Sequence, residues 1–136
     1  RMKFFTVEEL CQSHVATVRG IDNTPGDAER QNMELLIEKV LDPVRQAWGK
    51  PIIVNSGYRC EALNRAVGGV KTSQHLTGQA ADIRSSDGHN KGLFELIRAL
   101  NYIGTITFDQ LIDESNLSWI HVSYKSAGNR QQVLKL

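Results

Sequence analysis

Apolar residues recur along this chain with two different periods, and each period predicts a different kind of element. Steps of three and four residues from Met33 to Trp48 predict the main core helix, and similar steps from Leu93 to Leu100 predict a second amphipathic helix. A β-branched run at 51–55 predicts a buried strand, and alternation at 106–113 and 118–124 predicts a hairpin. These elements indicate an α+β fold in which helices pack on a small antiparallel sheet.

Local signals place the ends of these elements. Thr6 is suited to cap a short helix, and Thr24-Pro25 closes a loop at 18–26 and starts the core helix. Pro43 should kink the core helix, and Gly49 should end it. The remaining expectations are a short helix at 60–66, a strand at 79–83, a polar turn at 115–116 and no assigned role from Lys125 onward.

Composition and charge narrow the class of protein. The 136 residues suit one domain spanning 1–136, which is long enough to bury about two-thirds of its unfolded surface. A net charge of +1 without a basic run argues against a nucleic-acid partner. The chain has no apolar run near the roughly 18 residues of a membrane span, and its N-terminus lacks a signal-peptide pattern. We expect a monomer with free thiols at Cys11 and Cys60.

Side chains with metal-binding chemistry gather in the stretch 56–82 and recur at His121. His75 and Asp82 lie seven residues apart, so a loop and a following strand would supply them. Strand periodicity places Asp82 on the face opposite its apolar neighbours, and it does the same for His121 between Ile120 and Val122. Two imidazoles and one carboxylate suit Zn²⁺ and leave a fourth position for water.

Several motifs in and around this stretch resemble one protein family. They are SGYR at 56–59, Asn64, Gly68-Gly69, the pattern S-Q-H-x-x-G-x-A-x-D from Ser73 to Asp82, and Trp119-Ile120-His121. Together they cover roughly 25–124 and resemble the zinc D-alanyl-D-alanine carboxypeptidases and related peptidoglycan peptidases, whose fold is shared with the hedgehog signalling domain. The resemblance implies a zinc peptidase that acts on peptidoglycan peptides, with His75, Asp82 and His121 as metal ligands.

The resemblance also implies roles for neighbouring residues. Arg59 would hold the substrate carboxylate, because a guanidinium can donate two parallel hydrogen bonds to it. Ser73 and Gln74 would support the ligand loop or contact the substrate backbone. Gly78 and Ala80 carry little bulk, so we expect them to let the backbone pass close to the metal.

The chain departs from the family pattern at the position of the general base. Many relatives have an acidic residue three before the final histidine, where this chain has Ser118. The candidates are therefore Glu114 and Asp113, and the register of the hairpin decides which of them shares a face with His121. The alternation of Ile106, Phe108 and Ile112 favours Asp113, whereas the relative-like pattern D-Q-L-I-x-E favours Glu114, our choice for the base.

The missing acid leaves other functions open. A module that keeps its zinc but has lost the base would bind cell-wall peptides without cleaving them, and a structural phage component would use the metal only to hold its loop. Because no export signal is apparent, we expect synthesis in the cytoplasm. Delivery to the bacterial cell wall would then depend on lysis or a phage particle.

Overall fold

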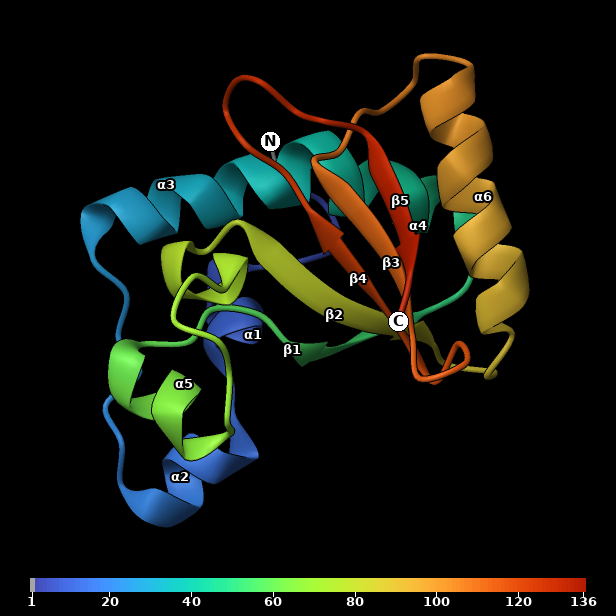
Figure 1. Cartoon of the computed structure of the whole chain (residues 1–136). Helices are drawn as coiled ribbons and strands as arrows, with labels where there is room; N and C mark the ends of the chain where they lie inside the picture. The colour runs from blue at the N-terminus through green and yellow to red at the C-terminus, as the bar shows by residue number, and fades with distance from the viewer. Residues whose placement is uncertain (1) are drawn as a thin grey trace.

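A five-stranded sheet organises the computed structural model, which describes residues 2–136 (Figure 1). Arg1, which the expected domain includes, lies outside the described residues. The strands are β1 (Ile52–Ser56), β2 (Ala80–Ser85), β3 (Gln110–Glu114), β4 (Trp119–Ser123) and β5 (Gln132–Lys135). Their order is β1-β2-β4-β3-β5, and every neighbouring pair is antiparallel except β3 and β5. The predicted α+β class is confirmed.

Helices cover one face of this sheet and leave the other face to the candidate site. The longest helical stretch comprises α3 (Asp27–Leu36), the π-helical turn η1 (Ile37–Leu41) and α4 (Asp42–Trp48), and α6 (Asn90–Tyr102) packs beside it (Figure 1). Inward side chains of β2 and β4 are fully buried in the core that these helices share with the sheet. They are Ala81, Ile83, Ile120 and Val122.

The core helix differs from the prediction at its start. The structure begins the helix at Asp27 with Gly26 as N-cap, two residues later than Thr24-Pro25 indicated. The hydroxyl of Thr24 donates instead to Asp22 Oδ1 over 2.6 Å, and its backbone N–H donates to the same oxygen. Thr24 therefore closes the preceding loop and does not cap the helix.

Pro43 disturbs the core helix in a specific way. The turn before it is π-helical, and the N–H of Asp42 donates to the carbonyl of Ile37, five residues back. Proline lacks an N–H and its ring crowds the preceding turn, so one wider turn lets the helix continue through it. Gly49 then ends the helix with φ 75°, as predicted.

Two short helices precede α3. Thr6 caps α1 (Val7–Cys11) as expected, because its hydroxyl accepts from the N–H of Glu9. The second helix, α2 (His14–Arg19), was not predicted, and its last two residues fall in the segment assigned to a loop. A serine cap at Ser13 and a left-handed Gly20 bound this helix, so local signals for it were present.

The C-terminal part of the sheet differs from the predicted hairpin. Strand β3 begins only at Gln110, so 106–109 lies outside it, and Ser115, Asn116 and Leu117 all have positive φ in the turn. The segment after Lys125, which received no role, contributes β5 as a parallel neighbour of β3. Among residues 2–136, no helix combines the length and apolar character needed to cross a membrane.

Candidate active site

The three predicted metal ligands come together on the open face of the sheet. Asp82 on β2 and His121 on β4 are direct partners in the antiparallel ladder, so their side chains share one face. His75 reaches them from the 3-10 turn η2 (Gln74–Thr77), which precedes β2. One ligand atom from each of the three residues lies within 4.8 Å of the others.

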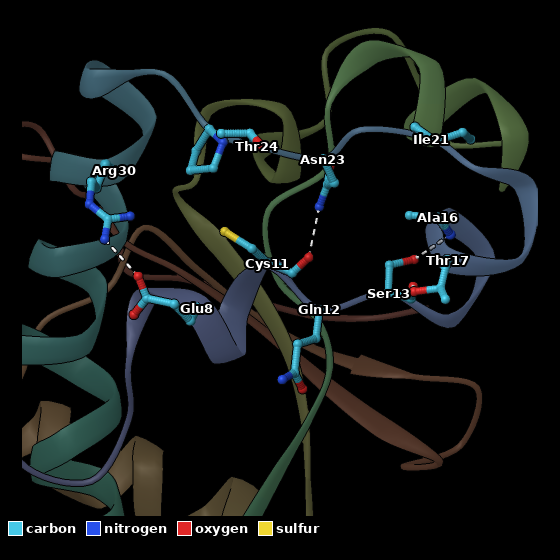
Figure 2. A pocket seen from close by; sticks show the side chains of 11 residues that line it. Glu8, Cys11, Gln12, Ser13, Ala16, Thr17, Ile21, Asn23, Thr24 and Arg30 are labelled. Atoms are coloured by element: carbon cyan, nitrogen blue, oxygen red, sulfur yellow. Dashed lines mark hydrogen bonds and ion pairs between the residues drawn. The ribbon is translucent and has the colours of Figure 1, made fainter.

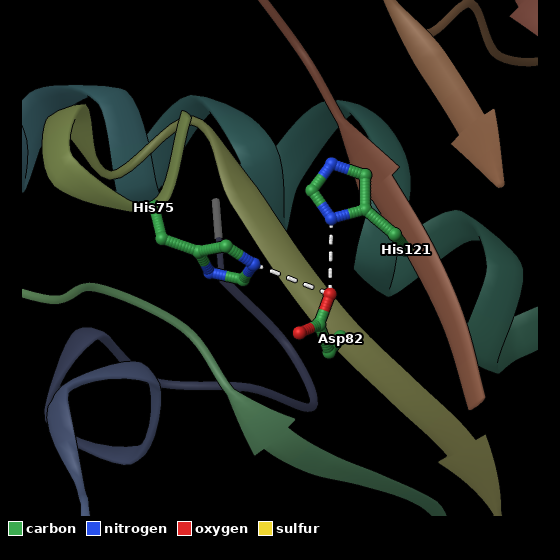
Figure 3. Close-up of side chains that lie close together, drawn as sticks. All are labelled: His75, Asp82 and His121. Carbon is green, nitrogen blue, oxygen red and sulfur yellow. Dashed lines mark hydrogen bonds and ion pairs between the residues drawn. The ribbon is translucent and has the colours of Figure 1, made fainter. Parts of the chain in front are cut away.

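Hydrogen-bond distances show that Asp82 joins the two histidines (Figure 3). Its Oδ1 lies 3.0 Å from Nδ1 of His121 and 3.2 Å from Nε2 of His75. Both imidazoles are buried, with their rings edge to face at 5.2 Å between centroids. Burial alone would raise the pKa of the Asp82 carboxyl, but the close approach of the two imidazoles, His121 first and then His75, lowers it well below its usual range. Asp82 is therefore a carboxylate at neutral pH.

The second ring nitrogen of His75 orients it toward Asp82. His75 Nδ1 lies 2.6 Å from the carbonyl oxygen of Gly57, and a carbonyl can only accept, so Nδ1 carries a proton. In the neutral ring, Nε2 then points a lone pair at the Asp82 oxygen. A cation between two such acceptors satisfies both, and a backbone carbonyl behind a ligating histidine is a common support in metal sites. The three side chains therefore fit a metal ion and form a candidate metal site.

Gly57 of the SGYR motif is required for this support. A Cβ at this position would lie 2.2 Å from the backbone oxygen of Leu10, and the N–H of Tyr58 donates to the same oxygen. The end of β1 is thus pressed against the last turn of α1. Only glycine allows this approach, and the approach places the Gly57 carbonyl under His75.

Gly78 serves a different purpose from the one predicted. It has φ 75° at the end of η2, and a Cβ there would lie 2.5 Å from the backbone oxygen of Glu29 on α3. The close approach is therefore to the core helix and not to the metal cluster. By seating η2 against α3, Gly78 sets the position of the turn that carries His75.

A groove with a volume of about 970 Å³ contains this cluster, and most of the other predicted site residues line it. Arg59, three residues after the end of β1, lines the wall of the groove. Its backbone N–H donates to the His75 carbonyl over 3.0 Å. Burial lowers the pKa of the Arg59 guanidinium, while the charge of Asp82 acts in the opposite direction. Its Nε is buried without a hydrogen-bond partner among the described residues. Because Arg59 lines the groove, it brings a positive charge to the side of β1.

The register of β3 and β4 separates the two candidate bases. Glu114 pairs with Trp119 and Ile112 pairs with His121, so Glu114 shares the face of His121 and lines the groove. Asp113 pairs with Ile120 on the opposite face, and its Oδ1 accepts from the N–H of Leu117 in the turn. The alternation argument for Asp113 assumed that Ile106, Phe108 and Ile112 all face the core from one strand. That assumption was wrong, because β3 starts at Gln110 and Ile112 shares the groove face with His121.

Ser73 and Gln74 brace the turn that carries His75, and both line the groove. The Ser73 hydroxyl accepts from the His75 N–H over 3.2 Å. Gln74 Nε2 donates to Asp109 Oδ2 over 2.9 Å, while its Oε1 is buried without a partner among residues 2–136. A contact of either side chain with substrate stays a prediction.

Sequence reasoning missed the residues that form the far wall of the groove. Asp109 is fully buried and paired with Arg130, which lines the groove together with Lys125. One available signal was an aspartate inside the apolar run T-F-D-Q-L-I, where an unpaired carboxylate would be costly. Its partner lies 21 residues away, at a spacing that no local pattern reports.

A separate cavity of about 420 Å³ lies beside α1 and α2 (Figure 2). An ion pair of 2.7 Å between Glu8 and Arg30 borders it, and Asn23 donates to the carbonyl of Cys11. Cys11 and Cys60 are both free thiols, in agreement with the expectation. None of the predicted site residues is among those that line this cavity.

Two histidines and a carboxylate at the floor of an open groove are the ligand set of a metal-dependent hydrolase. The chain belongs to the Peptidase M15 family, whose sequence model matches residues 3–123. It is also similar to a zinc D-Ala-D-Ala carboxypeptidase of Streptomyces albus G, with 48% identity over 44 residues. That alignment covers 32% of this chain and 17% of the relative.

Proposed function

We propose that this protein is a zinc-dependent peptidase that hydrolyses peptide bonds of peptidoglycan stem peptides. The convergence of His75, Asp82 and His121 in a groove that also presents Arg59 carries the proposal. Membership of the Peptidase M15 family and the zinc carboxypeptidase similarity support it. We expect the protein to act at the bacterial cell wall. The proposed site residues lie on one sheet or next to it, in keeping with one peptidase domain.

His75, Asp82 and His121 would hold the metal ion. Bound there, zinc would supply Lewis-acid polarisation of the scissile carbonyl and activation of a water molecule. Gly57 keeps the proton of His75 on Nδ1, which leaves Nε2 free to act as a ligand. Asp82 contributes the negative charge that a divalent cation needs, since its pKa lies far below neutral.

Glu114 would move protons between water and the leaving amine. It lies diagonally across the ladder from His121, a relation in which Cα atoms are about 7–8 Å apart. A carboxylate at that separation would reach a water molecule beside the metal cluster. It would accept a proton from the attacking water and then donate it to the amine, the role of a general base followed by a general acid.

Arg59 would orient the substrate. Its guanidinium stays protonated in proteins, Arg59 lines the groove, and a planar fork suits the free C-terminal carboxylate of a peptide. With that carboxylate bound on the side of β1, the last peptide bond would lie over the three ligands. We therefore propose a carboxypeptidase specificity.

Hydrolysis of purified peptidoglycan by the zinc-loaded protein tests the proposal. Mass spectrometry of the released groups should show terminal D-alanine, and release should stop with a chelator and return with zinc. Glu114→Gln should abolish release, while Asp113→Asn, the matched control on the opposite face of β3, should retain it. Tight zinc binding without any release would favour the non-catalytic binding module instead.

A further inference from the structure

The far wall of the groove carries two cations that the proposed reaction does not use. Lys125 and Arg130 both line the groove, and their side chains keep 35% and 52% of their surface exposed. The carboxylate between them, Asp109, is completely buried. A ligand that enters the groove would therefore meet the two cations and not the acid.

The charges in this wall do not cancel. Arg130 forms a two-pronged pair with Asp109, with Nε to Oδ1 at 3.0 Å and Nη2 to Oδ2 at 2.7 Å. Lys125 Nζ stands 3.6 Å from the same carboxylate, so two positive charges share one negative charge. The Arg130 pair lowers the pKa of the Asp109 carboxyl well below its usual range. The wall therefore keeps one excess positive charge at neutral pH.

Spare hydrogen-bond donors accompany that charge. Arginine has five N–H groups, and the side-chain pairing with Asp109 uses two of them. The Lys125 ammonium adds three donors. Arg130 and Lys125 thus retain donors of the kind that bind a carboxylate.

The segment that bears the cations is held in place. Asn129 Oδ1 accepts from the N–H of Lys125, and its Nδ2 donates to the Lys125 carbonyl, both over 2.8 Å. At the other end, the N–H of Arg130 donates to Asp109 Oδ1 over 3.0 Å. Because the loop is already ordered, binding an anion there would need little further loss of backbone entropy.

The strand register separates this wall from both Glu114 and Arg59. On β4, Trp119 pairs with Glu114 and comes two residues before His121. Lys125 comes four residues after His121, just beyond the end of β4. At about 3.3 Å per residue, Lys125 lies up to roughly 13 Å from His121. Arg59 follows β1, on the side of β2 away from β4. The groove therefore offers cations in two distinct places around the metal cluster.

We propose that Lys125 and Arg130 form a second anion subsite, which binds a side-chain carboxylate of the substrate peptide on the N-terminal side of the scissile bond. This inference rests on the proposed function, in which Arg59 takes the terminal carboxylate. An extended peptide covers about 3.3–3.6 Å per residue, so the second carboxylate belongs two to four residues from the bond that is cut. The preferred substrate is then a peptide with two separated carboxylates.

Peptide pairs that differ only by glutamate or glutamine provide the test. Each peptide ends in D-Ala-D-Ala with the scissile amide reduced to a methylene amine, so it binds without turnover. Glutamate is placed two, three or four residues before the bond. Isothermal titration calorimetry with the zinc-loaded protein gives the dissociation constant of each peptide. At one of the three positions, the glutamate peptide should bind about fivefold more tightly than its glutamine partner, as expected for a partly exposed charge pair. Added salt should weaken the preference.

Lys125→Met should remove most of this preference. Lys91→Met is the matched control, because Lys91 lies exposed on α6 outside the groove lining. Arg130 is left intact, since its removal would leave the buried Asp109 without its main partner. Hydrolysis of the natural amide peptides by the wild-type protein is followed separately.

The outcomes distinguish the subsite from the peptidase. Equal dissociation constants for glutamate and glutamine at all three positions would overturn the subsite, and so would undetectable binding of every peptide. A preference that survives in Lys125→Met would overturn the assignment to this wall. Absence of hydrolysis alongside a preference that Lys125→Met removes would refute the peptidase and leave the subsite standing.

Discussion

Replacing Gly57 by alanine should weaken metal binding, although Gly57 is not itself one of the proposed metal ligands. The added Cβ would lie 2.2 Å from Leu10 O and 2.9 Å from two further backbone carbons of Leu10. No side-chain rotation relieves a clash with backbone, so α1 and the end of β1 must separate. Because the Gly57 carbonyl holds the Nδ1 proton of His75, this separation also disturbs a ligand.

Two magnitudes follow for Gly57→Ala. Overpacking of this kind costs about 1–3 kcal/mol of unfolding free energy, or a melting temperature lower by roughly 4–12 °C for a chain of this size. Loss of an outer hydrogen bond to a ligating histidine lowers metal affinity about 10–100-fold. The two effects arise from one displacement and should appear together.

Zinc competition with a chromophoric chelator and thermal melts of the metal-free protein measure both effects. Gly26→Ala is a suitable control, because its Cβ would meet only the carboxylate end of Glu29, 2.6 Å away, which can rotate aside. A Gly57→Ala protein with zinc affinity within twofold of wild type and an unchanged melting temperature would refute the reasoning.

Three further predictions concern charged groups. Glu114→Gln should lower kcat by about 10²–10⁴ with unchanged zinc affinity by chelator competition, whereas equal losses in Asp113→Asn would contradict the register-based choice. Arg59→Lys should raise KM on the order of tenfold, since an ammonium cannot form the two parallel bonds, and an unaltered KM would exclude the contact. The lowered pKa of Asp109 stabilises the fold above the unfolded pKa of about 3.9, and this stabilisation is lost as pH falls toward the folded value. In Asp109→Asn, the unfolding free energy from urea titrations should therefore fall less steeply as the pH is lowered. An unchanged acid dependence would refute the role given to Asp109.

The residue pattern was sufficient to predict much of the fold. The apolar stripe of the core helix, the Gly49 stop and the strands that carry Asp82 and His121 all appear in the structure. Each depends on neighbours within a turn or two along the chain, where periodicity and capping act directly. The three metal-ligand candidates were likewise predicted, because their residue types suit zinc and their motifs resemble those of the zinc peptidases.

The residue pattern alone did not determine the register in which β3 pairs with β4. Whether Glu114 or Asp113 shares a face with His121 depends on where β3 begins and how the turn at 115–117 is built. A shift by one residue moves every side chain to the other face, so weak alternation could not decide it. The tertiary structure decided it through the pairing of Glu114 with Trp119.

Long-range contacts were also outside the reach of local patterns. The approach of Gly57 to Leu10, the seating of Gly78 on α3 and the burial of Asp109 by Arg130 join segments 21 to 49 residues apart. Sequence determined which side chains the chain carries and the chemistry they offer. Only the folded chain decided which of them meet, because the packing of helices and strands brings together residues whose separation along the chain carries no signal.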